Sequence, residues 1–169
     1  MASIARSLRP CASRLIVRPS QPYRALPFAA RAFSASRAAQ VKRYSKDHEW
    51  VEMSADNKTA MIGISEYAAS ALGDVVYVEL PTVPMEVAAG DSIGAVESVK
   101  SASDIISPIT CKVTAVNSLL EEKPGSINQG PEDDSAAGGW VAKVVVPEAG
   151  VKDFEELMDA EKYKEFTEE

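Results

Sequence analysis

The sequence is poor in the residues that enzymes most often use for acid-base or nucleophilic catalysis. Its 169 residues include one histidine and two cysteines. His48 has no second soft ligand with which to build a zinc site, and the carboxylates show no calcium-loop pattern. We therefore predict no catalytic residue and no metal site. A hydrolase that uses His48 as its base is the one enzymatic alternative.

Negative charge is absent from the first 40 residues, which contain seven arginines and six serines, and the first carboxylate belongs to Asp47. This composition is typical of a mitochondrial transit peptide, and arginines and prolines interrupt every apolar run that a secretory signal would need. A basic nucleic-acid-binding arm is the alternative. We predict a transit peptide at residues 1–40, a mature start between residues 34 and 41, and a location in the mitochondrial matrix.

The predicted mature chain is strongly acidic. Removing seven arginines changes the formal net charge from −7 to −14, which disfavours binding to nucleic acid or anionic lipid. Cys111 would be its only cysteine, so no intramolecular disulfide can form, as suits a reducing compartment. The longest apolar runs, such as Val144 to Val146, are far shorter than the ~20 residues of a membrane span. We expect no membrane partner.

Short apolar or alternating runs separated by turn residues fill most of the predicted mature domain, residues 41–169, and indicate a mainly β sandwich or barrel. The candidate strands are Trp50 to Met53, Thr59 to Ile64, Val75 to Leu80, Ser92 to Glu97, Ile105 to Ile109, Cys111 to Val116 and Trp140 to Val146.

Two segments have helical character. Residues 65–72 begin with a serine N-cap, are rich in alanine and end at Gly73, as a short helix does. Residues 152–166 carry apolar side chains at roughly helical spacing among charges, which predicts one or two C-terminal helices. Between them, residues 121–139 hold so many glycines, prolines and aspartates that we predict a surface loop.

The segment from Val96 to Asp104 places a lysine between two β-prone stretches. Its small residues predict a hairpin turn from which Lys100 projects on a flexible stem. An ordinary exposed lysine would look the same. A carrier protein, however, requires this placement, because a swinging group must stand clear of the fold.

Several segments of the sequence together resemble a known protein family. The segments that match in order are Gly73 to Pro81, Gly94 to Asp104, Ser107 to Pro108, Val113 to Asn117, His48 to Trp50, Lys123 to Asn128 and Gly139 to Trp140. They closely resemble glycine cleavage H proteins from about residue 44 onward. Biotinyl domains usually have methionines beside the lysine, and the lipoyl domains of 2-oxoacid dehydrogenases usually have an Asp-Lys-Ala tip. The sequence around Lys100 matches neither of these two families as well.

The resemblance implies a lipoyl/biotinyl-type β sandwich (barrel-sandwich hybrid) and a lipoyl group joined to Lys100. The lipoylation context would be Glu97, Ser98, Val99, Ser101 and Asp104. The arm would take the aminomethyl group of glycine from a glycine decarboxylase, the P protein, to an aminomethyltransferase, the T protein. A dihydrolipoyl dehydrogenase, the L protein, would reoxidise it, and a lipoyl transferase would attach it. The alternative is a non-catalytic interaction domain descended from lipoyl carriers.

The same resemblance suggests a cleft that shelters the loaded arm. A protonated amine in that cleft would favour a carboxylate, for which Glu49 is the first candidate and His48 and Asp104 are further ones. Cys111 departs from the family pattern, because it occupies what we expect to be a turn position where glycine is usual.

Overall fold

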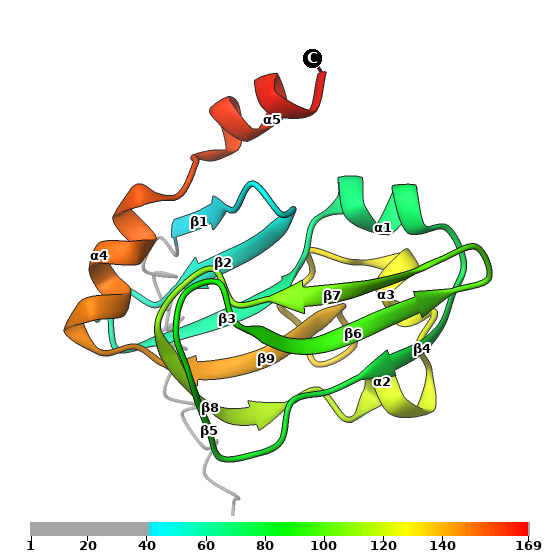
Figure 1. Ribbon diagram of the computed structural model, residues 1–169, viewed down its shortest axis with the longest axis horizontal. Helices are drawn as coiled ribbons and strands as arrows, with labels where there is room; N and C mark the ends of the chain where they lie inside the picture. The colour runs from blue at the N-terminus through cyan, green and yellow to red at the C-terminus, as the bar shows by residue number, and fades with distance from the viewer. Residues whose placement is uncertain (1–40, 169) are drawn as a thin grey trace, which may run out of the picture. The chain divides into compact units, whose positions relative to one another are not determined.

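The structure is a computed structural model and describes residues 41–168. The predicted transit peptide at residues 1–40 lies outside the described residues. Within residues 41–168, two antiparallel sheets pack against each other, which confirms the predicted mainly β sandwich (Figure 1).

The larger sheet has six strands in the order β1-β2-β3-β9-β8-β5, and the smaller sheet has three in the order β4-β6-β7. The strands are β1 (Val41–Tyr44), β2 (Glu49–Met53), β3 (Thr59–Ile64), β4 (Val75–Glu79), β5 (Met85–Val87), β6 (Ser92–Ser98), β7 (Ala102–Ile106), β8 (Cys111–Val116) and β9 (Trp140–Val145).

The hydrophobic core lies between the two sheets. Val96 and Ile105 of the small sheet and Ile62 and Val144 of the large sheet are at most 1% exposed and belong to one cluster. Burying each such side chain stabilises the fold by roughly 1.5–3 kcal/mol. Because alternate residues of a strand point to opposite faces, the neighbours of these side chains face outward, which explains the alternation read in the sequence.

Helix α1 (Glu66–Leu72) forms where the sequence predicts it. The Ser65 hydroxyl accepts a hydrogen bond from the backbone N–H of Ala68, and Gly73 ends the helix with a φ of 80°. A positive φ is accessible to glycine without a steric cost, so the glycine sets the point at which the chain leaves the helix.

The prediction of an irregular loop at residues 121–139 is wrong in part. One-turn helices α2 (Leu119–Glu122) and α3 (Ser126–Gln129) begin this region, and Leu120 and Ile127 are fully buried in the core. Such short helices have little intrinsic stability, so their formation depends on the burial of these two side chains. Composition does not reveal this burial, which is why it indicated a loop.

The largest differences from the predicted strands concern β1, β5 and β7. Strands β1 and β5, at the two edges of the large sheet, were not predicted, and β7 spans residues 102–106 where the prediction was 105–109. Cys111 is the first residue of β8 and is buried, not in a turn. The backbone of Cys111 is extended, so this position does not need the positive φ that would favour glycine.

The C-terminal tail is helical as predicted and forms two helices, the first of which starts earlier than expected. Helix α4 (Glu148–Glu156) begins directly after Pro147, and α5 (Ala160–Glu168) follows a break. At the break, Met158 exchanges two backbone hydrogen bonds with Tyr44 of β1, at 2.8 and 3.0 Å. This pairing to a strand is incompatible with a continuous helix.

Tyr163 connects α5 to the rest of the domain. Its ring stacks on that of Tyr44 with centroids 4.4 Å apart. Its hydroxyl lies 2.7 Å from the Ser65 hydroxyl at the start of α1 and 2.9 Å from Nδ1 of His48. One side chain therefore joins the tail, the first helix and the turn before β2.

We expect Tyr163→Phe to lower the free energy of unfolding by about 1–2 kcal/mol, because the buried Ser65 hydroxyl loses this partner. Urea unfolding followed by circular dichroism measures the change. Tyr67→Phe is the matched control, since Tyr67 is 47% exposed and should unfold like the wild type. Equal midpoints for the two variants would contradict the role given to the Tyr163 hydroxyl.

Candidate functional site

Lys100 lies in the tight turn that joins β6 to β7, and its side chain is exposed. The hydroxyl oxygen of Ser98 accepts hydrogen bonds from the backbone N–H groups of Lys100 and Ser101, at 3.1 and 3.0 Å. The backbone N–H of Ser98 donates to the carbonyl oxygen of Ser101 at 2.7 Å. The turn is thus held by Ser98, and the side chain of Lys100 stays exposed.

The chain segment after α1 supports this turn. The carbonyl oxygen of Asp74 accepts a hydrogen bond from the N–H of Val99 at 3.1 Å, and a Cβ atom added to Gly73 would lie 3.4 Å from the Lys100 amine. Asn128 of α3 donates to the carbonyl oxygen of Gly73 and accepts from the N–H of Val75. Asn128 is a positioning residue that the sequence analysis did not single out, although its motif was among those that matched.

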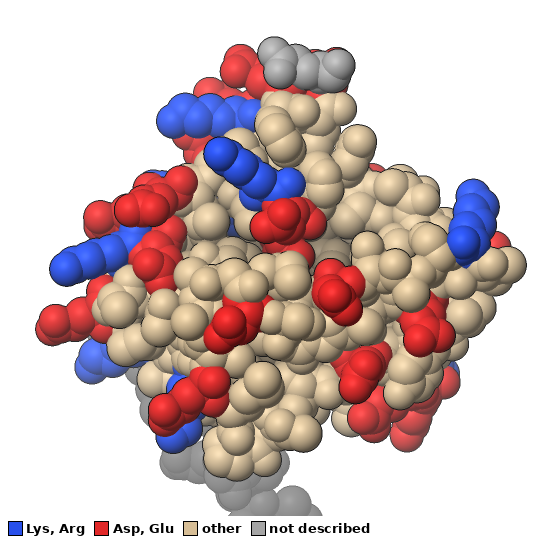
Figure 2. Space-filling model, in the orientation of Figure 1, with Lys and Arg blue, Asp and Glu red and all other residues tan. Residues whose placement is uncertain are grey.

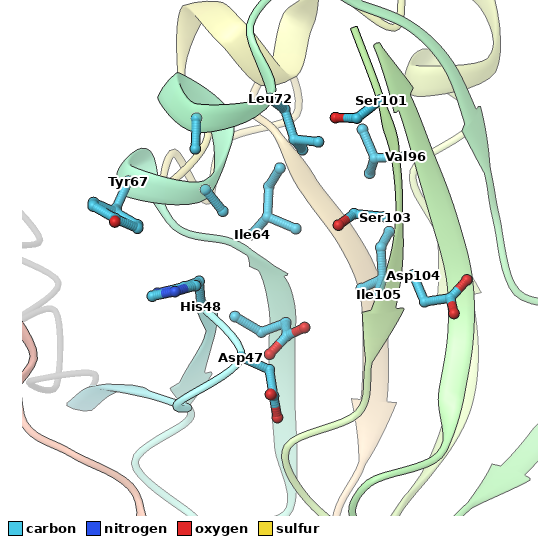
Figure 3. Close-up of a pocket in the computed structure, with 13 residues that line it drawn as sticks. Asp47, His48, Ile64, Tyr67, Leu72, Val96, Ser101, Ser103, Asp104 and Ile105 are labelled. Carbon is cyan, nitrogen blue, oxygen red and sulfur yellow. The ribbon is translucent and has the colours of Figure 1, made fainter. Parts of the chain in front are cut away.

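A pocket of about 300 Å³ opens beside the turn, between α1, the turn before β2, and β7. Figure 3 shows Leu72, Val96 and Ser101 at one end of the pocket and Asp47 and His48 at the other. Val96, Ser103 and Ile105 are contributed by the two strands that carry Lys100 at their tip. The pocket is therefore continuous with the lysine-bearing hairpin.

Glu49 is the buried carboxylate of this pocket, only 2% exposed. Its two oxygens accept hydrogen bonds from the Ser45 hydroxyl and, at 3.1 Å, from the backbone N–H of Ile106. Within residues 41–168 no lysine or arginine forms an ion pair with it. Burial raises the pKa of Glu49, and the two hydrogen bonds lower it only in part.

The other predicted cleft residues have different orientations. His48 has a φ of 74°, and its ring lies 4.7 Å from that of Tyr67 at the edge of the pocket. Asp104 contributes to the rim, but its carboxylate points away from His48, on the face of β7 opposite to Ser103 (Figure 3). The structure therefore brings His48 and Glu49 together and leaves the Asp104 carboxylate outside.

Asp47 also lines the pocket, and the sequence analysis did not select it. Its only sequence signal is its position next to His48 and Glu49. The turn before β2 brings Asp47 and Glu49 to the same pocket, so two carboxylates contribute to the lining there.

Comparison with known proteins decides the family. A sequence profile described as "Glycine cleavage H-protein" matches residues 42–169. The chain belongs to this family. It is 48% identical over 127 residues to "Glycine cleavage system H protein 2, mitochondrial" of Arabidopsis thaliana, an alignment that covers 75% of this chain and 76% of the plant protein.

Two further relatives agree with this assignment. The chain is 45% identical over 130 residues to "Glycine cleavage system H protein, mitochondrial" of Saccharomyces cerevisiae, covering 76% of this chain and 74% of the yeast protein. The crystal structure of a glycine cleavage system H protein from Mycobacterium marinum superposes with a TM-score of 0.63 at 34% identity, covering 75% and 96% of the two chains.

As a member of the glycine cleavage H-protein family, the chain is a carrier component of the glycine cleavage system and not a catalyst by itself. Residues 41–168 contain no cluster of side chains suited to bind a metal ion. Nor does any helix in this range have the length and apolar character of a membrane span.

We expect the stability of the protein to depend on pH through Glu49. Because the pKa of Glu49 is raised above its ordinary value of 4.5, the folded protein keeps a proton that the unfolded chain has already lost above this pH. Its contribution to stability is therefore fully present below pH 4.5 and is lost as the pH rises through the folded pKa.

Urea unfolding of the wild type and of Glu49→Gln between pH 4.5 and about 8 measures this effect. The stability of the wild type relative to the variant should fall as the pH rises. Glu165→Gln, at an exposed position of α5, should keep the wild-type pH profile. Parallel profiles for the wild type and Glu49→Gln would show that the carboxylate titrates alike in the folded and unfolded states.

Proposed function

We propose that Lys100 carries a lipoyl group in amide linkage and that the loaded arm shelters in the pocket beside it. The observation that carries the proposal is the position of Lys100. It is exposed at the tip of a turn held by Ser98, and the strands that meet at this tip line a pocket with the buried carboxylate of Glu49.

The residues present fit such a group. The wall of the pocket includes the apolar side chains of Leu72, Val96 and Ile105, which suit a hydrocarbon chain. The lipoyl group supplies the disulfide and dithiol chemistry that takes up and releases the aminomethyl group. The protein contributes the anchor, the wall and the carboxylate, and the amide bond removes the charge of Lys100.

Glu49 then acts as the counter-ion of the loaded arm. An aminomethyl group is cationic when protonated, and a carboxylate nearby attracts it most strongly where water is excluded. The ammonium group in turn favours the ionised form of Glu49 and brings its raised pKa down. The cost of burying an unpaired carboxylate is thus relieved when the pocket is filled.

The partners in this proposal are those of the glycine cleavage system. The glycine decarboxylase, or P protein, loads the arm, and the aminomethyltransferase, or T protein, transfers the methylene to tetrahydrofolate. The dihydrolipoyl dehydrogenase, or L protein, reoxidises the dithiol, and a lipoyl transferase attaches the group to Lys100. Membership of the glycine cleavage H-protein family supports this division of work.

We place the protein in the mitochondrial matrix, with residues 1–40 as its transit peptide. Two kinds of observation support this location. The first is the arginine-rich sequence without carboxylates before Asp47. The second is that the plant and yeast relatives are named mitochondrial.

We expect the protein isolated from its own mitochondria to start between residues 34 and 41 and to carry one lipoyl adduct, on Lys100. Intact-mass measurement with peptide mapping reads both features at once. Lys100→Arg should have the same mature start and no adduct. A bare Lys100 in cells that lipoylate other proteins would favour the interaction-domain alternative.

We expect Glu49→Gln to shorten the hydrolytic lifetime of the aminomethyl-loaded protein about tenfold, since a charge-assisted hydrogen bond of ~1.5 kcal/mol is lost. Hydrolysis consumes one water and releases formaldehyde and ammonia, so ammonia release measures the lifetime. Glu165→Gln controls for a lost negative charge at an exposed site. Equal lifetimes for all three proteins would remove Glu49 from the proposed shelter.

A further inference from the structure

The outward face of the small sheet carries both exposed apolar and acidic side chains. Val76 and Tyr77 of β4 are 54% and 53% exposed, and Val99 beside the lysine is 75% exposed. Strands β4, β6 and β7 contain no lysine or arginine. Figure 2 shows carboxylates among uncharged atoms over these strands, with basic side chains toward the borders.

The strand register puts Tyr77, Glu79, Glu97 and Asp104 on one face. Val76 lies in the β-bulge directly before Tyr77, and Val99 lies in the turn after β6. Tyr77 pairs with Glu97, which pairs with Ala102, and Glu79 pairs with Ala95, which pairs with Asp104. The alternate row, which includes Val78 and Val96, is buried in the core. The Asp104 carboxylate that points away from the pocket therefore belongs to this outer face. We call Val76, Tyr77, Val99, Glu79, Glu97 and Asp104 the outer patch.

The outer patch is continuous with the turn that carries Lys100. Val99 is the residue next to the lysine, and its N–H is hydrogen-bonded to Asp74, which directly precedes β4. Exposed valine and tyrosine side chains gathered at one place indicate a surface that a partner covers. The carboxylates around them select a partner whose contact surface is basic at its rim and apolar at its centre.

We propose that the outer patch is the docking surface for the enzyme that attaches the lipoyl group to Lys100. This inference rests on the proposed function of Lys100. The amine sits on a stem of four carbons, so an enzyme can reach it only by closing over the turn and the adjoining strands. The other partners meet a longer arm and need not contact this face.

The chemistry of attachment agrees with the charge of the patch. The deprotonated Lys100 amine attacks the carbonyl carbon of an activated lipoyl-adenylate. The amide C–N bond forms, the C–O bond to AMP breaks, and the amine proton passes to a base. An enzyme that holds such a phosphate ester presents basic residues around its active site, and these match the carboxylates beside Lys100.

The test uses apo-protein, lipoate, ATP and a purified lipoate–protein ligase, with intact mass as the readout. In Val76→Thr/Tyr77→Thr the apparent KM for apo-protein should rise about tenfold while kcat stays within twofold. Threonine keeps the preference for a strand, and the single variant Val76→Thr provides a milder change. Val145→Thr is the matched control, because Val145 is 43% exposed on β9 of the other sheet.

Charge is tested with Glu79→Gln, which should raise KM at low salt and weaken its dependence on ionic strength. Glu86→Gln is its control, since Glu86 lies exposed on β5 of the other sheet. A wild type that is never acylated at Lys100 would refute the proposed function itself. Normal acylation of the wild type with an unchanged KM in the double variant would refute only the docking surface. A loss confined to kcat would also refute it, because β4 would then position the lysine without binding the enzyme.

Discussion

The packing of the small sheet on the large one is the interaction on which the rest of the structure depends. The same strands bury Val96 and Ile105 in the core, end in the turn that presents Lys100, and expose the outer patch. Because successive side chains of a strand alternate between faces, the inner row lines the pocket near the turn and the outer row faces solvent. Core, pocket and outer patch therefore follow from one register.

Glu49 is a carboxylate buried next to this packed core. Burial disfavours its charge, and two hydrogen bonds compensate only in part. The carboxylate also has a structural role, because an apolar residue here would leave the Ser45 hydroxyl and the Ile106 N–H without this acceptor. In the proposed function, its place in the wall of a pocket that opens beside Lys100 suits a cationic group that arrives on the arm.

Sequence patterns were most successful where local and tertiary preferences agree. Alternation identified the central strands, and a serine cap with a terminal glycine identified α1. They failed where tertiary contacts overrule composition. Leu120 and Ile127 draw a turn-rich segment into two one-turn helices. The sequence left open whether the C-terminal tail forms one or two helices, and the bridge between Met158 and Tyr44 decides for two. Edge strands β1 and β5 are defined by their partners more than by their own residues.

The sequence by itself determined the class of fold, the family resemblance and the lysine at the centre of the functional proposal, because these depend on periodicity and motif order. Tertiary structure alone decided which carboxylates surround the pocket. Asp104 is close to Lys100 in sequence, yet the register of β7 turns it to the outer face. Glu49 is far away in sequence, yet its oxygen accepts a hydrogen bond from Ile106 at the end of β7. The physical reason is that a site is assembled by long-range strand pairing, and the direction of each side chain is set only when its strand finds a neighbour.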